Sequence, residues 1–235
     1  MSVHPEELGP DVGATLVSAR PLVEYRAMLG LTDADLVGRR VLDCPGGGSS
    51  FVAEASALGA RAVAVDPLYA HSDAEIAARV RRDVLRGNRF VREHPERYVW
   101  TFFRNPDEHR DLRGAGGERF VRDLAAHRER YVPAALPDLP FADAAFDLAL
   151  SSHLLFTYAD RHDFDFHVAA ARELARVAVE ARFFPLVDLS PRRYPFLDDL
   201  VAALADEGVT ATVAPVDYEF QRGGDEMLVV RRGLR

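Results

Sequence analysis

The sequence predicts an α/β fold built on a mostly parallel sheet. Two apolar runs, at residues 40–43 and 61–66, are hydrophobic nearly throughout, which is typical of parallel strands covered by helices on both faces. A glycine-rich turn at 46–50 and a helical run to Leu58 lie between them, and the second run ends in Asp66. A strand, a tight glycine turn, a helix and a second strand that ends in an acid form the pattern of a nucleotide-binding βαβ unit.

The N-terminal part, residues 1–35, reads as a helical arm in front of this unit. Residues 1–20 are expected to form a flexible arm or a weak helix, because glycine and proline interrupt scattered apolar positions. Pro21 can start a helix that ends at Gly30, and Thr32 and Asp33 can cap one further turn before the first strand.

A long helical insertion is expected between the second and third strands, over residues 70–130. Helical spacing recurs at 73–90 and 117–131, with a glycine turn at 114–117, whereas a crossover in an open α/β sheet usually needs one helix. The connection between the two helices is rich in aromatic residues, and we expect these, with Tyr69, to form a helical lid over the ligand. A second small core is the alternative interpretation. The residues concerned are Tyr98, Trp100, Phe102 and Phe103.

The rest of the chain returns to alternating strands and helices. Its last two strands, joined across Gly223 and Gly224, read as an antiparallel pair. The predicted helices are 164–179 and 194–206, and the predicted strands are 131–136, 146–151, 181–187, 209–220 and 226–231.

Composition excludes several classes of function. The 235 residues are 48% hydrophobic, which supplies ample core, and no composition break divides them, so a single domain over 1–235 is expected. The net charge of -8 argues against nucleic-acid or anionic-membrane partners. All 29 basic residues are arginine, which excludes lysine Schiff-base chemistry. Cys44 is the single cysteine, and no apolar run approaches the ~20 residues of a membrane helix, so a cytoplasmic protein is expected.

Three stretches together resemble the class I S-adenosylmethionine (SAM)-dependent methyltransferases. Residues 43–49, Asp-Cys-Pro-Gly-Gly-Gly-Ser, are similar to the first motif of that family, and Asp66 is similar to its ribose-binding acid. Residues 139–148 resemble its proline-phenylalanine loop and fourth strand. The resemblance covers about residues 36 to 232 and implies a Rossmann-like, seven-stranded, mostly parallel sheet with an antiparallel C-terminal pair, and SAM as the cofactor.

The resemblance also implies a set of cofactor-binding residues. Positions 133–135 depart from the family, which often carries an adenine-binding acid there, and Asp138 is a candidate substitute. NAD binding is the rival interpretation, because a glycine turn followed by an acid is common to both ligands. The implied cofactor-binding residues are Asp43, Pro45, Gly46, Gly47, Gly48, Ser49, Asp66, Pro67 and Ser151.

Candidates for chemistry follow the fourth strand, at the sheet edge where open α/β folds build their sites. His153, beside Ser152, is a candidate general base or substrate contact, since the ordinary imidazole pKa lies near neutrality. Phe156 or Tyr158 can stabilise a sulfonium through an aromatic face. For each of these residues, packing or a bond to a loop carbonyl is the plainer alternative.

A metal site is not expected, although four residues invite one. His162, Asp163, Asp165 and His167 lie close in sequence, but a helix cap with solvated polar residues explains them more simply. Cys44, beside the glycine turn, is expected to pack or to neighbour the ligand rather than to act as a nucleophile.

Three functions remain open at the level of sequence. The first is methyl transfer from SAM to a small molecule, which needs orientation more than acid or base strength. The second is cyclisation of SAM itself to azetidine-2-carboxylate and methylthioadenosine, because residues 218–224 and 152–156 resemble the azetidine-2-carboxylate synthase subgroup. The third is a SAM-binding protein without catalysis. The acceptor and the oligomeric state are not determined by the sequence.

Overall fold

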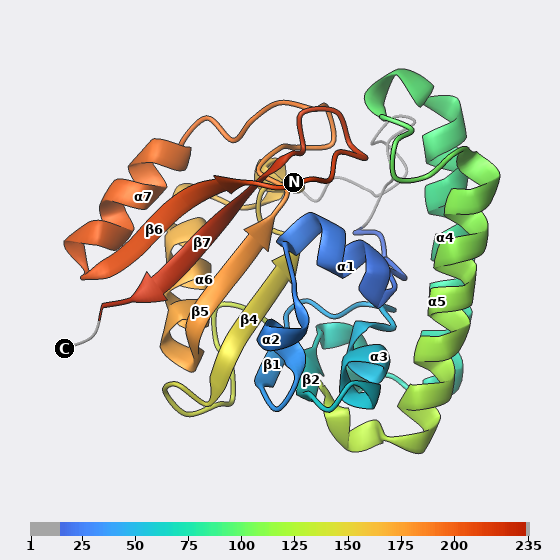
Figure 1. Cartoon of the computed structure of the whole chain (residues 1–235), viewed down its shortest axis with the longest axis horizontal. Coiled ribbons are helices and arrows are strands. Elements are labelled where there is room, and N and C mark those ends of the chain that lie inside the picture. The colour runs from blue at the N-terminus through green and yellow to red at the C-terminus, as the bar shows by residue number, and fades with distance from the viewer. Residues whose placement is uncertain (1–14, 234–235) are drawn as a thin grey trace, which may run out of the picture.

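Seven strands form one sheet in the order β3-β2-β1-β4-β5-β7-β6 in the computed structural model, which describes residues 15–233 (Figure 1). Strands β1 to β5 pair in parallel, and β7 pairs antiparallel with both β5 and β6. The Rossmann-like sheet with an antiparallel C-terminal pair is therefore confirmed. The strands are β1 (Arg40–Asp43), β2 (Arg61–Val65), β3 (Tyr131–Val132), β4 (Phe146–Ser152), β5 (Ala178–Phe184), β6 (Val209–Pro215) and β7 (Glu226–Arg232).

Helices cover both faces of the sheet (Figure 1). α1 (Leu22–Leu29) and α3 (Phe51–Ala57) contact one face, and α6 (Phe164–Val177) and α7 (Leu197–Asp206) pack on the other. Each face buries its own hydrophobic cluster. A short helix, α2 (Asp33–Leu36), precedes β1. Within residues 15–233, no helix is both long and apolar enough to cross a membrane.

The strand order reverses beside β1, which pairs with β2 on one side and β4 on the other. In register, Asp43 at the end of β1 lies opposite Ala64 of β2 and Leu150 of β4. The carboxyl ends of these three strands therefore meet at one edge, at the topological switch point where open α/β sheets bind ligands.

The predicted helical insertion is present as two long helices that lie side by side, α4 (Asp73–Glu93) and α5 (Pro106–Ala126) (Figure 1). The predicted turn at 114–117 is wrong, because these residues lie inside α5. A Cβ atom on Gly116 would lie 2.8 Å from the Ala19 carbonyl oxygen, and one on Gly117 would lie 3.0 Å from Val80 Cγ1. These glycines thus allow close packing of α5 rather than a reversal of the chain.

Residues 15–20 do not form the expected flexible arm or weak helix; the remainder of that prediction, at 1–14, lies outside the described residues. The segment runs between the glycine turn and α4 and is held by hydrogen bonds to both. Ser18 O accepts from Gly48 N at 2.9 Å, and Val17 N donates to Asp83 Oδ2 at 3.0 Å. The N-terminal segment is therefore a fixed wall of the site described below.

Three predicted strands extend beyond the observed C-terminal ends of these strands. β3 has two residues rather than six, β5 ends at Phe184, and β6 ends at Pro215. Residues 216–225 instead return to the insertion, where Val99 N donates to Phe220 O at 2.8 Å and Arg222 N donates to Arg97 O at 2.8 Å. The end of the sheet and the insertion are thereby joined.

Candidate functional site

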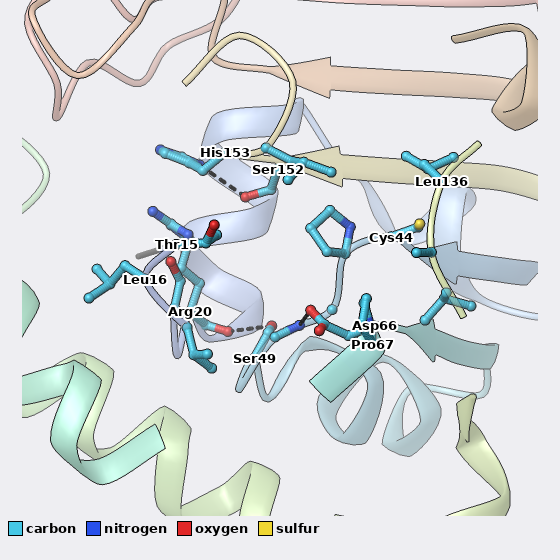
Figure 2. A pocket seen from close by; sticks show the side chains of 18 of the residues that line it. Thr15, Leu16, Arg20, Cys44, Ser49, Asp66, Pro67, Leu136, Ser152 and His153 are labelled. Atoms are coloured by element: carbon cyan, nitrogen blue, oxygen red, sulfur yellow. Dashed lines mark hydrogen bonds between the residues drawn. The ribbon is translucent and has the colours of Figure 1, made fainter. Parts of the chain in front are cut away.

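A cavity of about 370 Å³, here called the main cavity, opens at the carboxyl ends of β1, β2 and β4. Figure 2 shows Ser152 and His153 on one side of it, Asp66 and Pro67 on another, and residues from Thr15 to Arg20 along a third. Its other lining residues include Cys44, Pro45, Gly46, Gly47, Ser49, Val65, Ala134, Ala135 and Leu136.

The glycine turn owes its composition to packing as well as to backbone conformation. Gly47 has φ 53°, in the left-handed region that favours glycine. A Cβ atom on Gly46 would lie 2.5 Å from the Tyr69 hydroxyl, and one on Gly48 would lie 2.6 Å from Val80 Cγ2. The Cα of Gly48 therefore packs against α4. Gly48 does not line the main cavity, in contrast to its predicted role as a ligand contact.

Asp66 connects the glycine turn to the residues after β2. Its Oδ2 accepts a hydrogen bond from Gly47 N at 3.0 Å, and its Oδ1 accepts one from Leu68 N at 2.9 Å. Burial raises the pKa of this carboxyl above its ordinary 3.8, and the two backbone donors oppose that shift. Each carboxylate oxygen has a second lone pair, so Asp66 can still accept hydrogen bonds from a ligand.

Asp43 and Ser151 lie beneath the main cavity rather than in its wall. Asp43 is 1% exposed, and both of its carboxylate oxygens lie 3.0 Å from the Tyr25 hydroxyl, which donates to them. Burial raises the pKa of Asp43 well above its ordinary value. Ser151 is buried in β4. The two residues therefore support the turn and the strand end, and their predicted direct contact with the ligand does not fit this placement.

His153 stands at the end of β4 in a strained backbone conformation, with φ 54°. Its backbone N donates to Phe184 O at 2.7 Å, and its Nδ1 lies 3.0 Å from Ser152 Oγ. Burial lowers the pKa of the imidazole well below 6.5, and the positive charges of Arg20 and Arg113 lower it further. His153 is therefore a neutral hydrogen-bonding group near pH 7, and a weak base.

The structure separates the two aromatic candidates that follow β4. Phe156 is 2% exposed, its ring lies 5.8 Å from that of His167 and 5.2 Å from that of Tyr194, and it lines no described cavity. The expected sulfonium contact does not fit Phe156, because the core covers its ring. Tyr158 accepts a hydrogen bond from Leu16 N at 3.1 Å and lines a second cavity.

This second cavity, here called the side cavity, has a volume of about 70 Å³ and adjoins the main cavity. Four residues line both: Leu16, Ser18, Arg20 and His153. The insertion and the C-terminal segment supply most of the other walls of the side cavity, including Gly87, Phe90, Tyr98, His109, Arg113 and Phe220, and the loop after β4 adds Thr157 and Tyr158.

The aromatic connection of the insertion packs against the C-terminal segment, and both belong to the hydrophobic cluster that also contains Phe51 of α3, so they form no separate second core. The rings of Tyr98 and Phe103 lie 4.7 and 4.8 Å from that of Phe220, and Phe102 lies 5.0 Å from Tyr218. Of the aromatic residues in the connection, Tyr98 lines the side cavity and none lines the main cavity, so a lid over the ligand stays a prediction. Tyr69, grouped with this lid, instead packs on Phe120 and Tyr131.

The remaining candidates are Asp138, Cys44 and the residues around His167. Asp138 is exposed and lines no described cavity, so it does not replace an adenine-binding acid. Cys44 lines the main cavity, but burial raises the pKa of its thiol well above 9.0, so it remains protonated. Among the described residues, no three or more His, Cys, Asp or Glu side chains are grouped as metal ligands, and both ring nitrogens of His167 lie near backbone carbonyl oxygens.

The residues that sequence reasoning missed come from the N-terminal segment and from α5. Arg20 is 6% exposed and Arg113 is 8% exposed, and both line the side cavity. An arginine in an acidic, arginine-rich chain carries no local signal that it will be buried. The pairing of Arg113 with the fully buried Glu24, 89 positions away, appears only in the folded structure.

Comparison with known proteins gives one full-length relative and a set of fold neighbours. No protein-family model matches the chain. An uncharacterized protein of Methanocaldococcus jannaschii is 29% identical over 223 residues, which are 93% of this chain and 96% of the relative.

Two solved structures illustrate the fold neighbours. The magnesium protoporphyrin IX methyltransferase of Synechocystis with bound SAM has 13% identity and a TM-score of 0.49, covering 90% of this chain and 78% of that chain. The 1,6-didemethyltoxoflavin-N1-methyltransferase of Burkholderia thailandensis has 18% identity and a TM-score of 0.43, covering 90% and 80%. The name of the Methanocaldococcus relative states no activity.

Proposed function

We propose that this protein is a SAM-dependent methyltransferase that acts on a small molecule. The observation that carries the proposal is the hydrogen bonding of the glycine turn. Backbone N–H groups 46 to 50 all donate within the protein: to Val65 O, Asp66 Oδ2, Ser18 O, Gly46 O and Arg20 O. A dinucleotide site instead needs such groups free for a pyrophosphate. This arrangement favours an adenosyl ligand without phosphates over NAD.

The walls of the main cavity fit the parts of SAM. Its volume, about 370 Å³, lies within the range of ~300–1,000 Å³ usual for small-molecule sites. Asp66 has free lone pairs for a ribose diol, and the apolar group formed by Val65, Pro67, Ala134 and Leu136 suits an adenine ring. The described walls after β3 are apolar and include no carboxylate.

The chemistry proposed for the site is orientation rather than acid–base catalysis. When bound, SAM supplies a sulfonium methyl group for in-line transfer to an acceptor. Arg20 and His153, which line both cavities, are placed to orient groups that lie between them. A neutral His153 can donate or accept a hydrogen bond without carrying charge beside a sulfonium. Ser152, 3.0 Å from His153 Nδ1, fixes the ring as a positioning residue.

Calorimetric titration tests the proposal with three ligands: S-adenosylhomocysteine, SAM and NAD. We expect both adenosyl ligands to bind and NAD to bind far more weakly. Asp66→Asn should weaken both adenosyl ligands about tenfold or more, since a charged hydrogen-bond acceptor is lost. Preferential binding of NAD, or adenosyl binding that ignores Asp66, would overturn the proposal.

Cyclisation of SAM is the second candidate, and the size of the side cavity favours it. A volume of about 70 Å³ leaves little room for a separate acceptor. In that reaction the SAM amine attacks its own γ-carbon, the carbon–sulfur bond breaks, methylthioadenosine leaves and the amine loses a proton. Incubation with SAM alone distinguishes the candidates: methylthioadenosine formed without an acceptor supports cyclisation, and methyl transfer to an added acceptor supports the first proposal. Tight binding without either product would indicate a non-catalytic protein.

A further inference from the structure

Four buried polar atoms in the walls of the side cavity have no hydrogen-bond partner among the described residues. One of them, Arg20 Nε, lies 3.3 Å from Glu24 Oε1 in an ion pair, which leaves three without either kind of partner: His109 Nε2, Arg113 Nε and Thr157 Oγ1. The three residues are only 2%, 8% and 4% exposed. Buried polar atoms are nearly always hydrogen-bonded in folded proteins, so three orphans around one small cavity indicate a missing partner.

The unpartnered atom of His109 is a donor. The Asn88 side-chain nitrogen, which also donates to Pro106 O at 2.6 Å, lies 3.2 Å from His109 Nδ1. An amide nitrogen only donates, so Nδ1 accepts and Nε2 carries the proton. Burial lowers the pKa of His109 to about 2, with further contributions from Arg113, Arg20 and Arg92, so the ring stays neutral. Arg113 Nε is also a donor, and the Thr157 hydroxyl can donate.

The same cavity is short of negative charge. Arg20 and Arg113 share one carboxylate, Glu24, whose Oε1 lies 3.3 Å from Arg20 Nε and 2.5 Å from Arg113 Nη2. The Tyr218 hydroxyl donates to the same oxygen at 2.8 Å. Glu24 is fully buried and does not line the cavity, and its second oxygen, Oε2, also has no hydrogen-bond partner among the described residues. Two cations against one anion leave a net charge of one, which is costly to bury without a counter-ion.

We propose that the side cavity is a subsite for a carboxylate group. A carboxylate accepts hydrogen bonds only, carries one negative charge and fits a small volume, and these are the three properties that the walls require. The proposal rests on the proposed function, because a ligand in the main cavity would extend its carboxylate past Arg20 and His153. That carboxylate belongs either to the methionyl part of SAM or to a methyl acceptor.

Thr157→Val is the most informative variant. It keeps the shape of the side chain and removes an unsatisfied buried hydroxyl, so the melting temperature should be unchanged or higher. A purely structural role for Thr157 therefore predicts no loss of binding. Thr157→Ser, which keeps the hydroxyl, and Thr212→Val, at an exposed position of β6, are the matched controls. His109→Phe removes a second donor independently.

The probes are S-adenosylhomocysteine, which carries the methionyl carboxylate, and methylthioadenosine, which lacks it. Acetate and benzoate, each beside its amide, are then titrated into the protein saturated with methylthioadenosine. We expect Thr157→Val to weaken the carboxylate-bearing probe about tenfold or more, as for a hydrogen bond to a charged group, while the two control variants bind normally.

The pattern of losses identifies the source of the carboxylate. Weaker S-adenosylhomocysteine with unchanged methylthioadenosine assigns the subsite to SAM, and weaker acetate or benzoate alone assigns it to an acceptor. Unchanged binding of every carboxylate by both Thr157→Val and His109→Phe overturns the inference. Asp66-dependent adenosyl binding in that case leaves the proposed function standing. Carboxylate binding that depends on Thr157 without any adenosyl binding would instead remove the proposed function and keep the subsite.

Discussion

Replacing Glu24 by glutamine should destabilise the protein strongly, because Glu24 is the shared counter-charge of two buried arginines. Its side chain is fully buried, and those of Arg20 and Arg113 are 8% and 10% exposed. Glutamine keeps the shape and removes the charge, so two guanidinium groups lose their partner. Breaking a buried ion pair in this way costs about 3–5 kcal/mol. A protein of this size loses about 2–4 °C of melting temperature per kcal/mol, so we expect a decrease of about 6–20 °C.

Urea unfolding followed by circular dichroism measures the free energy of unfolding of wild type and variant. Glu118→Gln is the matched control: Glu118 pairs with Arg81 at 2.7 Å, but the two side chains are 47% and 56% exposed. An exposed pair of this kind contributes about 0–1 kcal/mol. If Glu24→Gln lowers the free energy of unfolding no more than Glu118→Gln does, the two arginines are solvated or differently paired. The side cavity would then carry no unbalanced buried charge that a carboxylate has to neutralise.

Three further predictions concern packing, pH and the N-terminal segment. Gly114→Ala should stabilise α5 by about 0.5–1 kcal/mol, since a Cβ there meets nothing within 4 Å, whereas Gly116→Ala, 2.8 Å from Ala19 O, should destabilise it by about 1–3 kcal/mol in the same urea assay. The pKa of Asp66 is raised, so its carboxylate gains a proton at a pH above 3.8 when the pH is lowered. We therefore expect the affinity for S-adenosylhomocysteine to fall as the pH is lowered, with a midpoint above pH 3.8, and titrations of Asp66→Asn across pH should show no such loss. Tyr158→Phe removes the acceptor of Leu16 N and should speed proteolytic cleavage near residue 16, with a cost of about 1 kcal/mol.

The sequence predicted those parts of the fold that depend on local signals. β1 was predicted at its observed bounds, because an apolar run ends there in an acid and a glycine turn. The start of α5 was missed by eleven residues, at Pro106 instead of 117, because three glycines between 114 and 117 indicate a turn when read alone. Gly116 and Gly117 are instead explained by the close approach of Ala19 and Val80, a tertiary contact that no local pattern records.

In the candidate site, too, local patterns predict some residues, and tertiary packing alone determines the others. The glycine turn, Asp66 and His153 could be placed at the sheet edge from the strand pattern, since parallel strands end together. Asp43 and Phe156 could not be separated from true wall residues, because their distance from the main cavity depends on which side chains pack above them. Arg20, His109 and Arg113 join the site only through the packing of α5 against residues 15–20.

Among residues 15–233, the histidines that line the two cavities are weakened as bases, and this constrains the proposed acceptor. The pKa values of His109, His153 and His162 are all lowered, by burial in each case, and both oxygens of Asp66 already accept backbone hydrogen bonds. A nucleophile that must lose a proton to become reactive would find in each of these imidazoles a weaker base than an ordinary histidine. The site therefore suits an acceptor that already has a free lone pair at neutral pH, and it suits transfer in which binding and orientation supply the rate.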